Sequence, residues 1–217
     1  MLKAVLFDMD GVIVDTMHLH SKATDFAFSS LGIAEQRHLL KKFGALPTEE
    51  AIKRAFPEKS LEEVSLIVDL KYKKLKELAS ELIILPGFLD FFKKVSVEFK
   101  TALVSNSSRD FVEYVVSKLP DFVKFDVIIS SSDVVNGKPD PECYLKAAEF
   151  LGLNVYECVV IEDSLVGIVA GKAAGMKVVA VETTHDKIFL QDADLIVRSL
   201  QELSVSSLLS LFSKKNF

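Results

Sequence analysis

The sequence predicts an α/β protein: a doubly wound, parallel, Rossmann-like sheet core that carries an inserted all-helical cap domain. Short apolar segments alternate along the chain with segments of helical periodicity, which is the pattern of a parallel sheet covered by helices on both faces. The alternation fails only between residues 17 and 85, where helical patterns follow one another without a convincing strand. We therefore assign residues 1–16 and 86–217 to the α/β core domain and residues 17–85 to the cap domain.

The predicted strands are apolar runs that lack the alternation of a half-exposed strand, as expected for strands buried on both faces. They span Ala4–Phe7, Thr101–Val104, Val127–Ile129, Cys158–Ile161, Lys177–Val181 and Leu195–Val197.

Helices are predicted where apolar residues recur at helical spacing between start and stop signals. Two such segments end at Gly152 and Gly175, which can take the left-handed conformation that closes a helix. The predicted core helices are Phe88–Val97, Arg109–Leu119, Pro141–Leu151 and Ser164–Ala174. The predicted cap helices are His18–Leu31, Glu35–Phe43, Thr48–Phe56 and Leu61–Leu82.

Composition argues against several classes of protein. The 31 acidic and 26 basic residues give a net charge of −5, whereas nucleic-acid-binding domains are usually basic with a clustered basic face. No apolar run reaches the roughly 18 residues of a membrane span, and the first acid comes too early for a signal peptide. Cys143 and Cys158 do not make a disulfide framework. We expect a cytoplasmic monomer that binds neither nucleic acid nor a membrane.

Polar residues follow four of the apolar segments, in the stretches Asp8–Gly11, Ser105–Ser108, Gly137–Pro141 and Glu162–Ser164. The carboxyl ends of parallel strands meet at one edge of a sheet, where ligands bind. Carboxylates crowded at such an edge repel one another unless a cation lies between them. Oxygen ligands without His or Cys favour Mg²⁺. A cation beside a lysine and a carboxylate nucleophile is the apparatus of phosphoryl transfer.

The same stretches resemble the four motifs of the haloacid dehalogenase superfamily, in the same order. The matching residues are Phe7–Thr16, Val104–Ser107, Gly137–Pro141 and Ile161–Ser164. The helical insertion after the first motif resembles the cap of the subgroup that contains β-phosphoglucomutase, phosphoglycolate phosphatase and sugar-phosphate phosphatases. The resemblance covers nearly the whole chain. It excludes the dehalogenases, because their first motif lacks the second acid that stands here as Asp10.

The resemblance implies a role for each matching residue. Asp8 would attack phosphorus and form an aspartyl phosphate, and Asp10 would protonate the leaving alcohol and then deprotonate water. Ser105 and Lys138 would bind the transferring phosphate, and Asn106 would bind the adjacent oxygen or the substrate.

The resemblance also implies the cofactor, Mg²⁺. It would be held by the Asp8 carboxylate, the backbone carbonyl of Asp10 and Asp163, with Glu162 close by.

Thr16 and His20 complete the predicted substrate-binding set. In β-phosphoglucomutase-like sequences a histidine at this spacing orients the general acid/base; His20 either does this or lies on a solvated helix face. We expect Ser164 to cap the following helix. Arg109 either reaches the substrate or faces solvent. The remaining histidines are expected on the surface, at His18, His38 and His185.

The cap departs from the mutase pattern, in which an arginine shortly after a glycine grips the non-transferring phosphate. Here Gly44 is followed by Ala45, Leu46, Pro47 and Thr48. Lys71 is a candidate for a mutase cap lysine, although its neighbours match poorly. Loss of a bidentate clamp disfavours a bisphosphate intermediate.

The leading hypothesis is therefore a Mg²⁺-dependent phosphatase acting on a small phosphorylated metabolite, either a sugar phosphate or a phosphoglycolate-like acid. A β-phosphoglucomutase-type isomerase is the alternative. A phospho-receiver or sensor module without turnover is the third.

Overall fold

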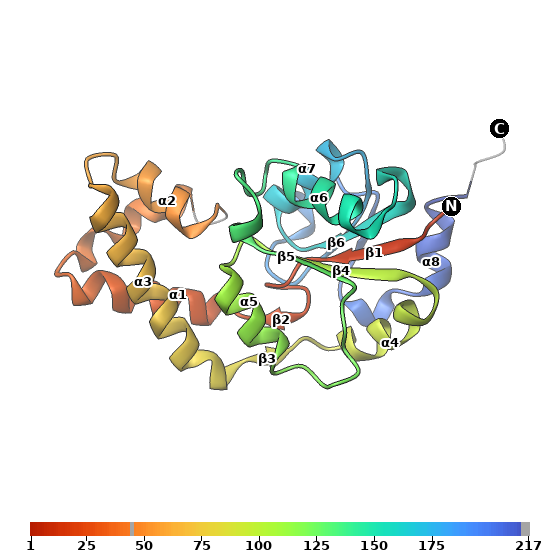
Figure 1. Ribbon diagram of the computed structural model, residues 1–217, viewed down its shortest axis with the longest axis horizontal. Helices are drawn as coiled ribbons and strands as arrows, with labels where there is room; N and C mark the ends of the chain where they lie inside the picture. Colours follow the sequence, from red (N-terminus) through yellow and green to blue (C-terminus); the bar gives the residue numbers. More distant parts are fainter. Residues whose placement is uncertain (44–45, 214–217) are drawn as a thin grey trace.

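The computed structural model describes residues 1–43 and 46–213 and contains a central sheet of six parallel strands in the order β5-β4-β1-β6-β7-β8 (Figure 1). Every strand predicted from the sequence is present, and two of them are one residue longer than predicted. The strands are β1 (Ala4–Phe7), β4 (Lys100–Val104), β5 (Val127–Ile129), β6 (Cys158–Glu162), β7 (Lys177–Val181) and β8 (Leu195–Val197).

The first strand lies at the centre of the sheet and sets the position of the site. Phe7 at the end of β1 is in register with Leu103 of β4 on one side and with Ile161 of β6 on the other. The residues that follow these three therefore emerge together at one edge. Strand order also reverses at β1, so this edge is a topological switch point of the kind at which α/β proteins bind ligands.

Helices cover both faces of the sheet, which confirms the doubly wound architecture. Side chains of β1 alternate between two buried clusters: Val5 and Phe7 pack on one face, and Ala4 and Leu6 on the other. The first face is covered by α4 (Phe88–Glu98), α5 (Arg109–Val116) and α8 (Val205–Ser210). The second face is covered by α6 (Glu142–Leu151) and α7 (Leu165–Ala173).

The ends of the core helices agree with their signals, with one exception. Gly152 and Gly175 have φ values of 69° and 79°, the left-handed conformation expected of them. The helix predicted over Arg109–Leu119 ends at Val116. Pro120 disfavours the helical conformation of the residue before it, so the last predicted turn does not form. The short helix α8 was not predicted.

Four helical segments between β2 (Val14–Asp15) and β3 (Ile83–Ile84) form the cap. They are α1 (Met17–Ser30), a 3₁₀ helix (Ala34–Lys42), α2 (Thr48–Ala55) and α3 (Leu61–Leu78), followed by a 3₁₀ turn (Ala79–Glu81). The cap has its own buried cluster, made of Ala27, Phe28, Ile52, Phe56, Val64 and Ile67. The predicted division of the chain at residues 16 and 86 stays a prediction.

Two details of the cap differ from the sequence analysis. The second predicted helix is a 3₁₀ helix over Ala34–Lys42; two of its half-buried positions, Arg37 and Leu40, lie three residues apart, which is the period of that helix. The last predicted helix ends at Leu78, and strand β3 follows within the segment in which no strand was expected. Strand β3 pairs antiparallel with β2, so the two chain connections to the cap lie side by side.

Within residues 1–43 and 46–213, no helix is long and apolar enough to cross a membrane. Gly44 and Ala45, the start of the stretch in which the mutase arginine was sought, lie outside the described residues.

Candidate active site

The four polar stretches meet at the carboxyl edge of the sheet, around the side chain of Lys138. This lysine is only 2% exposed. Its Nζ atom donates to Asp8 Oδ1 (2.5 Å), to Glu162 Oε1 (2.7 Å) and to the carbonyl oxygen of Val104 (3.0 Å). An ammonium group has three protons, so every donor of Lys138 is used. Although burial alone would lower it, the pKa of Lys138 is raised well above its usual value by Asp8 and Glu162.

Three buried carboxylates crowd this edge: Asp8, Glu162 and Asp163 each offer an oxygen within 4.8 Å of the others. Burial, together with the neighbouring Glu162, raises the pKa of Asp163 to about 8. Burial also raises the pKa of Asp8 well above its usual value, against the opposing charge of Lys138. One lysine thus leaves an excess of negative charge. An all-oxygen donor set with excess charge fits a hard divalent cation such as Mg²⁺.

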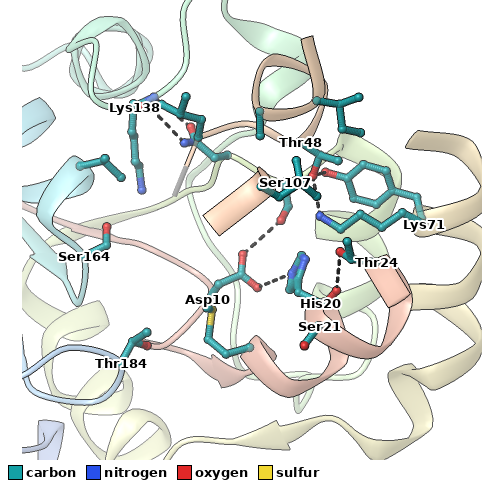
Figure 2. Close-up of a pocket in the computed structure, with 18 of the residues that line it drawn as sticks. Asp10, His20, Ser21, Thr24, Thr48, Lys71, Ser107, Lys138, Ser164 and Thr184 are labelled. Carbon is teal, nitrogen blue, oxygen red and sulfur yellow. Dashed lines mark hydrogen bonds and ion pairs between the residues drawn. The ribbon is translucent and has the colours of Figure 1, made fainter. Parts of the chain in front are cut away.

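Asp10 lies beside this cluster with its carboxylate held by four side-chain donors, of which Figure 2 shows His20 and Ser107. Thr16 Oγ1 and His20 Nε2 contact Oδ1, the latter at 3.3 Å. Ser105 Oγ (3.4 Å) and Ser107 Oγ (3.1 Å) donate to Oδ2. Burial works against ionisation, but the bond from His20 and those from the hydroxyl groups lower the pKa of Asp10. The arrangement stabilises the carboxylate form.

Asn106 fastens the loop that carries Lys138. Its Oδ1 atom accepts from the backbone N–H of Lys138 (3.0 Å), and its Nδ2 atom donates to the Lys138 carbonyl oxygen (3.3 Å). On the other side of this loop, a Cβ built at Gly137 would overlap the ring of Pro47 in the cap. The loop therefore packs between Asn106 of the core and Pro47 of the cap.

A cavity of about 560 Å³ lies between this edge and the cap. Its core wall includes Asp8, Asp10, Asn106, Ser107, Lys138 and Asp163. Its cap wall combines polar side chains with apolar ones, including Thr24, Thr48, Lys71 and Tyr72 among the former and Phe28, Leu40, Ile52 and Ile67 among the latter. Figure 2 shows Lys71 reaching across the cavity to Thr48, where its Nζ donates to Thr48 Oγ1 (2.7 Å).

The structure gives the positions of the residues whose roles the sequence left open. His20 faces Asp10 and does not lie on a solvated face. Thr16 is fully buried and contacts Asp10. Ser164 caps α7, as expected, by accepting from the N–H of Gly167 (3.1 Å). Arg109 donates to Asp133 (2.5 Å) and to the carbonyl oxygen of Ile128 (3.2 Å), outside the cavity lining.

His185 is partly exposed, in line with the expected surface position, but it also lines the cavity, on the loop that follows β7. The next residue back, Thr184, lies against Gly11 and Asp163. Ser107 was also missed as a partner of Asp10. The sequence carries no pattern that separates Ser107 from Ser108, because the difference lies only in the direction of each side chain.

The comparisons with known proteins agree with this geometry. The model of the haloacid dehalogenase-like hydrolase family matches residues 5–181. Validoxylamine A 7'-phosphate phosphatase from Streptomyces hygroscopicus subsp. limoneus is 30% identical over 94% of this chain and 96% of its own length. Hexitol phosphatase A from Escherichia coli is 29% identical over 94% of both chains. The crystal structure of β-phosphoglucomutase from Clostridium difficile superposes with a TM-score of 0.83 at 28% identity, over 98% of this chain and 97% of that one.

Proposed function

The chain belongs to the haloacid dehalogenase-like hydrolase family, and from this membership we propose that it is a Mg²⁺-dependent phosphatase of a small phosphorylated metabolite. The proposal rests mainly on two acids at the sheet edge: Asp8, which Lys138 contacts, and Asp10. Both acids line one cavity beneath the cap. The two curated relatives named above are phosphatases by name.

In this proposal Mg²⁺ is held by the carboxylates of Asp8 and Asp163 and by the backbone carbonyl of Asp10. The buried, like-charged Asp8–Asp163 pair supports this choice, because both acids need a cation to ionise. When bound, the ion would neutralise charge on the phosphoryl oxygens and so ease the approach of an anionic nucleophile.

The chemistry of the chain's own residues follows in two steps. A carboxylate oxygen of Asp8 forms a bond to phosphorus while the bond from phosphorus to the ester oxygen breaks, and Asp10 gives its proton to the leaving oxygen. Water then attacks the aspartyl phosphate, Asp10 takes the proton of the water, and free phosphate and the Asp8 carboxylate are regenerated. In both steps the ammonium group of Lys138 would lie beside the transferring phosphoryl group and balance part of its negative charge.

The donors around Asp10 suit the second step, because they favour the ionised form that acts as a base. To act as an acid, Asp10 must carry a proton, and a protonated carboxyl group cannot accept all four bonds equally well. Thr16, His20, Ser105 and Ser107 are therefore proposed as residues that orient Asp10, which moves Thr16, His20 and Ser105 from the predicted substrate-binding set.

The cavity favours a leaving group larger than a two-carbon acid. Its volume of about 560 Å³ lies in the range of sites that enclose a whole small-molecule ligand. The hydroxyl groups of Thr24, Thr48 and Tyr72 suit the hydroxyl groups of a polyol or sugar. Arg37 is already paired with Asp25 and donates to Ser21 Oγ (2.6 Å), so its charge is compensated. We propose a sugar or polyol phosphate as the substrate.

A β-phosphoglucomutase-type isomerase is the second candidate. It is favoured by the similarity to a structure of that name and by Lys71, whose ammonium group lines the cavity and, among the described residues, forms no ion pair with a carboxylate. A mutase must hold two phosphate groups at once. Arg37, a second cap cation that lines the cavity, is already paired with Asp25, which favours hydrolysis.

The test is phosphate release from a panel of hexose phosphates, hexitol phosphates, phosphoglycolate, glycerol phosphates and nucleotides, with Mg²⁺ and with a chelator. We expect Mg²⁺-dependent release from sugar or polyol phosphates, and none from an Asp8→Asn protein. Conversion of β-glucose 1-phosphate to glucose 6-phosphate with little release would favour the mutase. A stable phosphoprotein without turnover would favour the receiver hypothesis.

A further inference from the structure

The carboxylate of Glu162 lies in a closed site built partly by two residues outside the four motifs, Tyr144 on α6 and Gly167 on α7. Tyr144 is fully buried, and its hydroxyl donates to Glu162 Oε1 (2.9 Å). The same oxygen accepts from Lys138 Nζ, which also lies over the Tyr144 ring, 5.0 Å from its centroid. One phenol thus contacts both members of the Lys138–Glu162 ion pair.

Gly167 provides the space for this carboxylate. A Cβ atom built at position 167 would overlap both oxygens of Glu162 and the carbon between them. The backbone conformation of Gly167 is one that any residue can adopt, since its φ is not positive. The absence of a side chain, and not conformational freedom, is therefore what this position contributes.

The hydrogen bonds of Glu162 leave no room for a further ligand. Its Oε1 accepts from Lys138 and Tyr144, and its Oε2 accepts from the N–H groups of Asp163 (3.0 Å) and Ser164 (3.1 Å) and from Ser164 Oγ (2.9 Å). A carboxylate has about four lone-pair positions. Five donors occupy these positions. Glu162 belongs to the acidic cluster that could hold a metal ion, but its lone pairs are already in use.

We propose that Tyr144 and Gly167 are positioning residues: by holding Glu162 in place they fix the ammonium group of Lys138, and Glu162 is the counter-ion of Lys138 and not a ligand of Mg²⁺. This inference rests on the proposed function, in which Lys138 binds the phosphate. Lys138 divides its three donors among Asp8, Glu162 and a carbonyl oxygen. A Glu162 carboxylate that loses the Tyr144 bond draws the ammonium group toward itself and away from the phosphate.

The experiment compares Tyr144→Phe with wild type by calorimetric titration, first with Mg²⁺ and then, at saturating Mg²⁺, with inorganic phosphate. Phenylalanine keeps the ring beside Lys138 and removes only the hydroxyl. We expect phosphate affinity to fall about tenfold, the effect of one hydrogen bond to a charged group, and Mg²⁺ affinity to stay within about twofold. Tyr156→Phe is the matched control, because Tyr156 is 64% exposed, and should behave as wild type.

Gly167→Ala is the second variant. Alanine is the better helix former, so at an open helix position the change would stabilise the protein, whereas here it displaces Glu162. We expect a larger loss of phosphate affinity than in Tyr144→Phe, on the order of a hundredfold, because the buried ion pair is then broken.

Three results would overturn the inference. Wild-type phosphate affinity in Tyr144→Phe would remove the positioning role, and a larger loss of Mg²⁺ affinity than of phosphate affinity would make Glu162 a metal ligand. A wild-type protein that binds neither Mg²⁺ nor phosphate would overturn the proposed function as well. The first two outcomes leave the wild-type titrations intact, so the two failures can be told apart.

Discussion

Replacing Lys138 by methionine removes the single buried cation that faces two buried carboxylates. Lys138 and Glu162 side chains are 3% and 0% exposed, and that of Asp8 is 10% exposed. Breaking a buried ion pair by removing one partner costs about 3–5 kcal/mol, because the remaining charge is left uncompensated. Methionine has a similar length and supplies no charge. We expect the free energy of unfolding of Lys138→Met to be lower than that of wild type by about this amount near pH 7.5.

The loss should shrink as the pH falls. In the wild type the pKa of Glu162 is lowered; burial opposes this, and the charge of Lys138 outweighs it. A carboxyl group whose folded pKa lies below its unfolded value stabilises the fold above the unfolded pKa, and this contribution is lost as the pH falls through the folded pKa. In the variant that contribution is gone. Without Lys138 the buried carboxylates ionise less readily in the folded protein than in the unfolded chain, so the folded state loses more stability as the pH rises. The difference between the two proteins is therefore largest at neutral pH and smallest in acid.

The assay is urea unfolding of both proteins at pH 7.5 and at pH 5, with a chelator and with Mg²⁺. Mg²⁺ should recover part of the loss at pH 7.5, because a bound cation replaces some of the missing positive charge. Lys53→Met, at an exposed i,i+4 pair with Glu49, controls for the loss of a lysine and should have little effect. A deficit that is equal at both pH values would refute the electrostatic argument.

Three further predictions concern residues that line the cavity. Ser107→Ala removes one donor to Asp10, so the pKa of Asp10 should rise and the acidic limb of the pH–rate profile should move to higher pH; an unmoved limb would contradict the role of this bond. Burial lowers the pKa of Lys71 from 10.5 to about 8, so Lys71 is still mostly charged at pH 7, and carrying this charge destabilises the folded protein. The free energy of unfolding of Lys71→Met at pH 7, measured by urea unfolding, should therefore exceed that of wild type by up to about 3 kcal/mol. Its KM for the substrate should rise. Asp163→Asn should weaken calorimetric Mg²⁺ binding on the order of a hundredfold or more, whereas Asp140→Asn should leave it unchanged.

The core of the fold could be predicted because its evidence is local. Most of each buried strand is an apolar run, and three of the four polar stretches directly follow such a run, so Asp8, Ser105 and Glu162 could be located from sequence spacing alone. Strand β3 was missed for the opposite reason. Ile83 and Ile84 form a strand only because Val14 and Asp15 lie beside them, and this pairing joins residues nearly seventy positions apart. His185 and Tyr144 were missed likewise, since only the packing of their elements turns them toward the site.

The roles of the acids show where residue identity stops being informative. Asp8, Asp10, Glu162 and Asp163 are all carboxylates at one sheet edge, yet each meets different partners. His20 and three hydroxyl groups surround Asp10, and their hydrogen bonds lower its pKa against burial, which favours the ionised form that can take a proton. Lys138, backbone N–H groups and two hydroxyls saturate Glu162. Asp8 shares Lys138 with Glu162, and burial still raises the pKa of Asp8 well above its usual value. Among the described residues no lysine forms an ion pair with Asp163, and burial together with Glu162 raises its pKa to about 8. Asp8 and Asp163 are therefore the two acids that a divalent cation would help to ionise, and adding a chelator or substituting Asp163→Asn should weaken phosphate release in the same way.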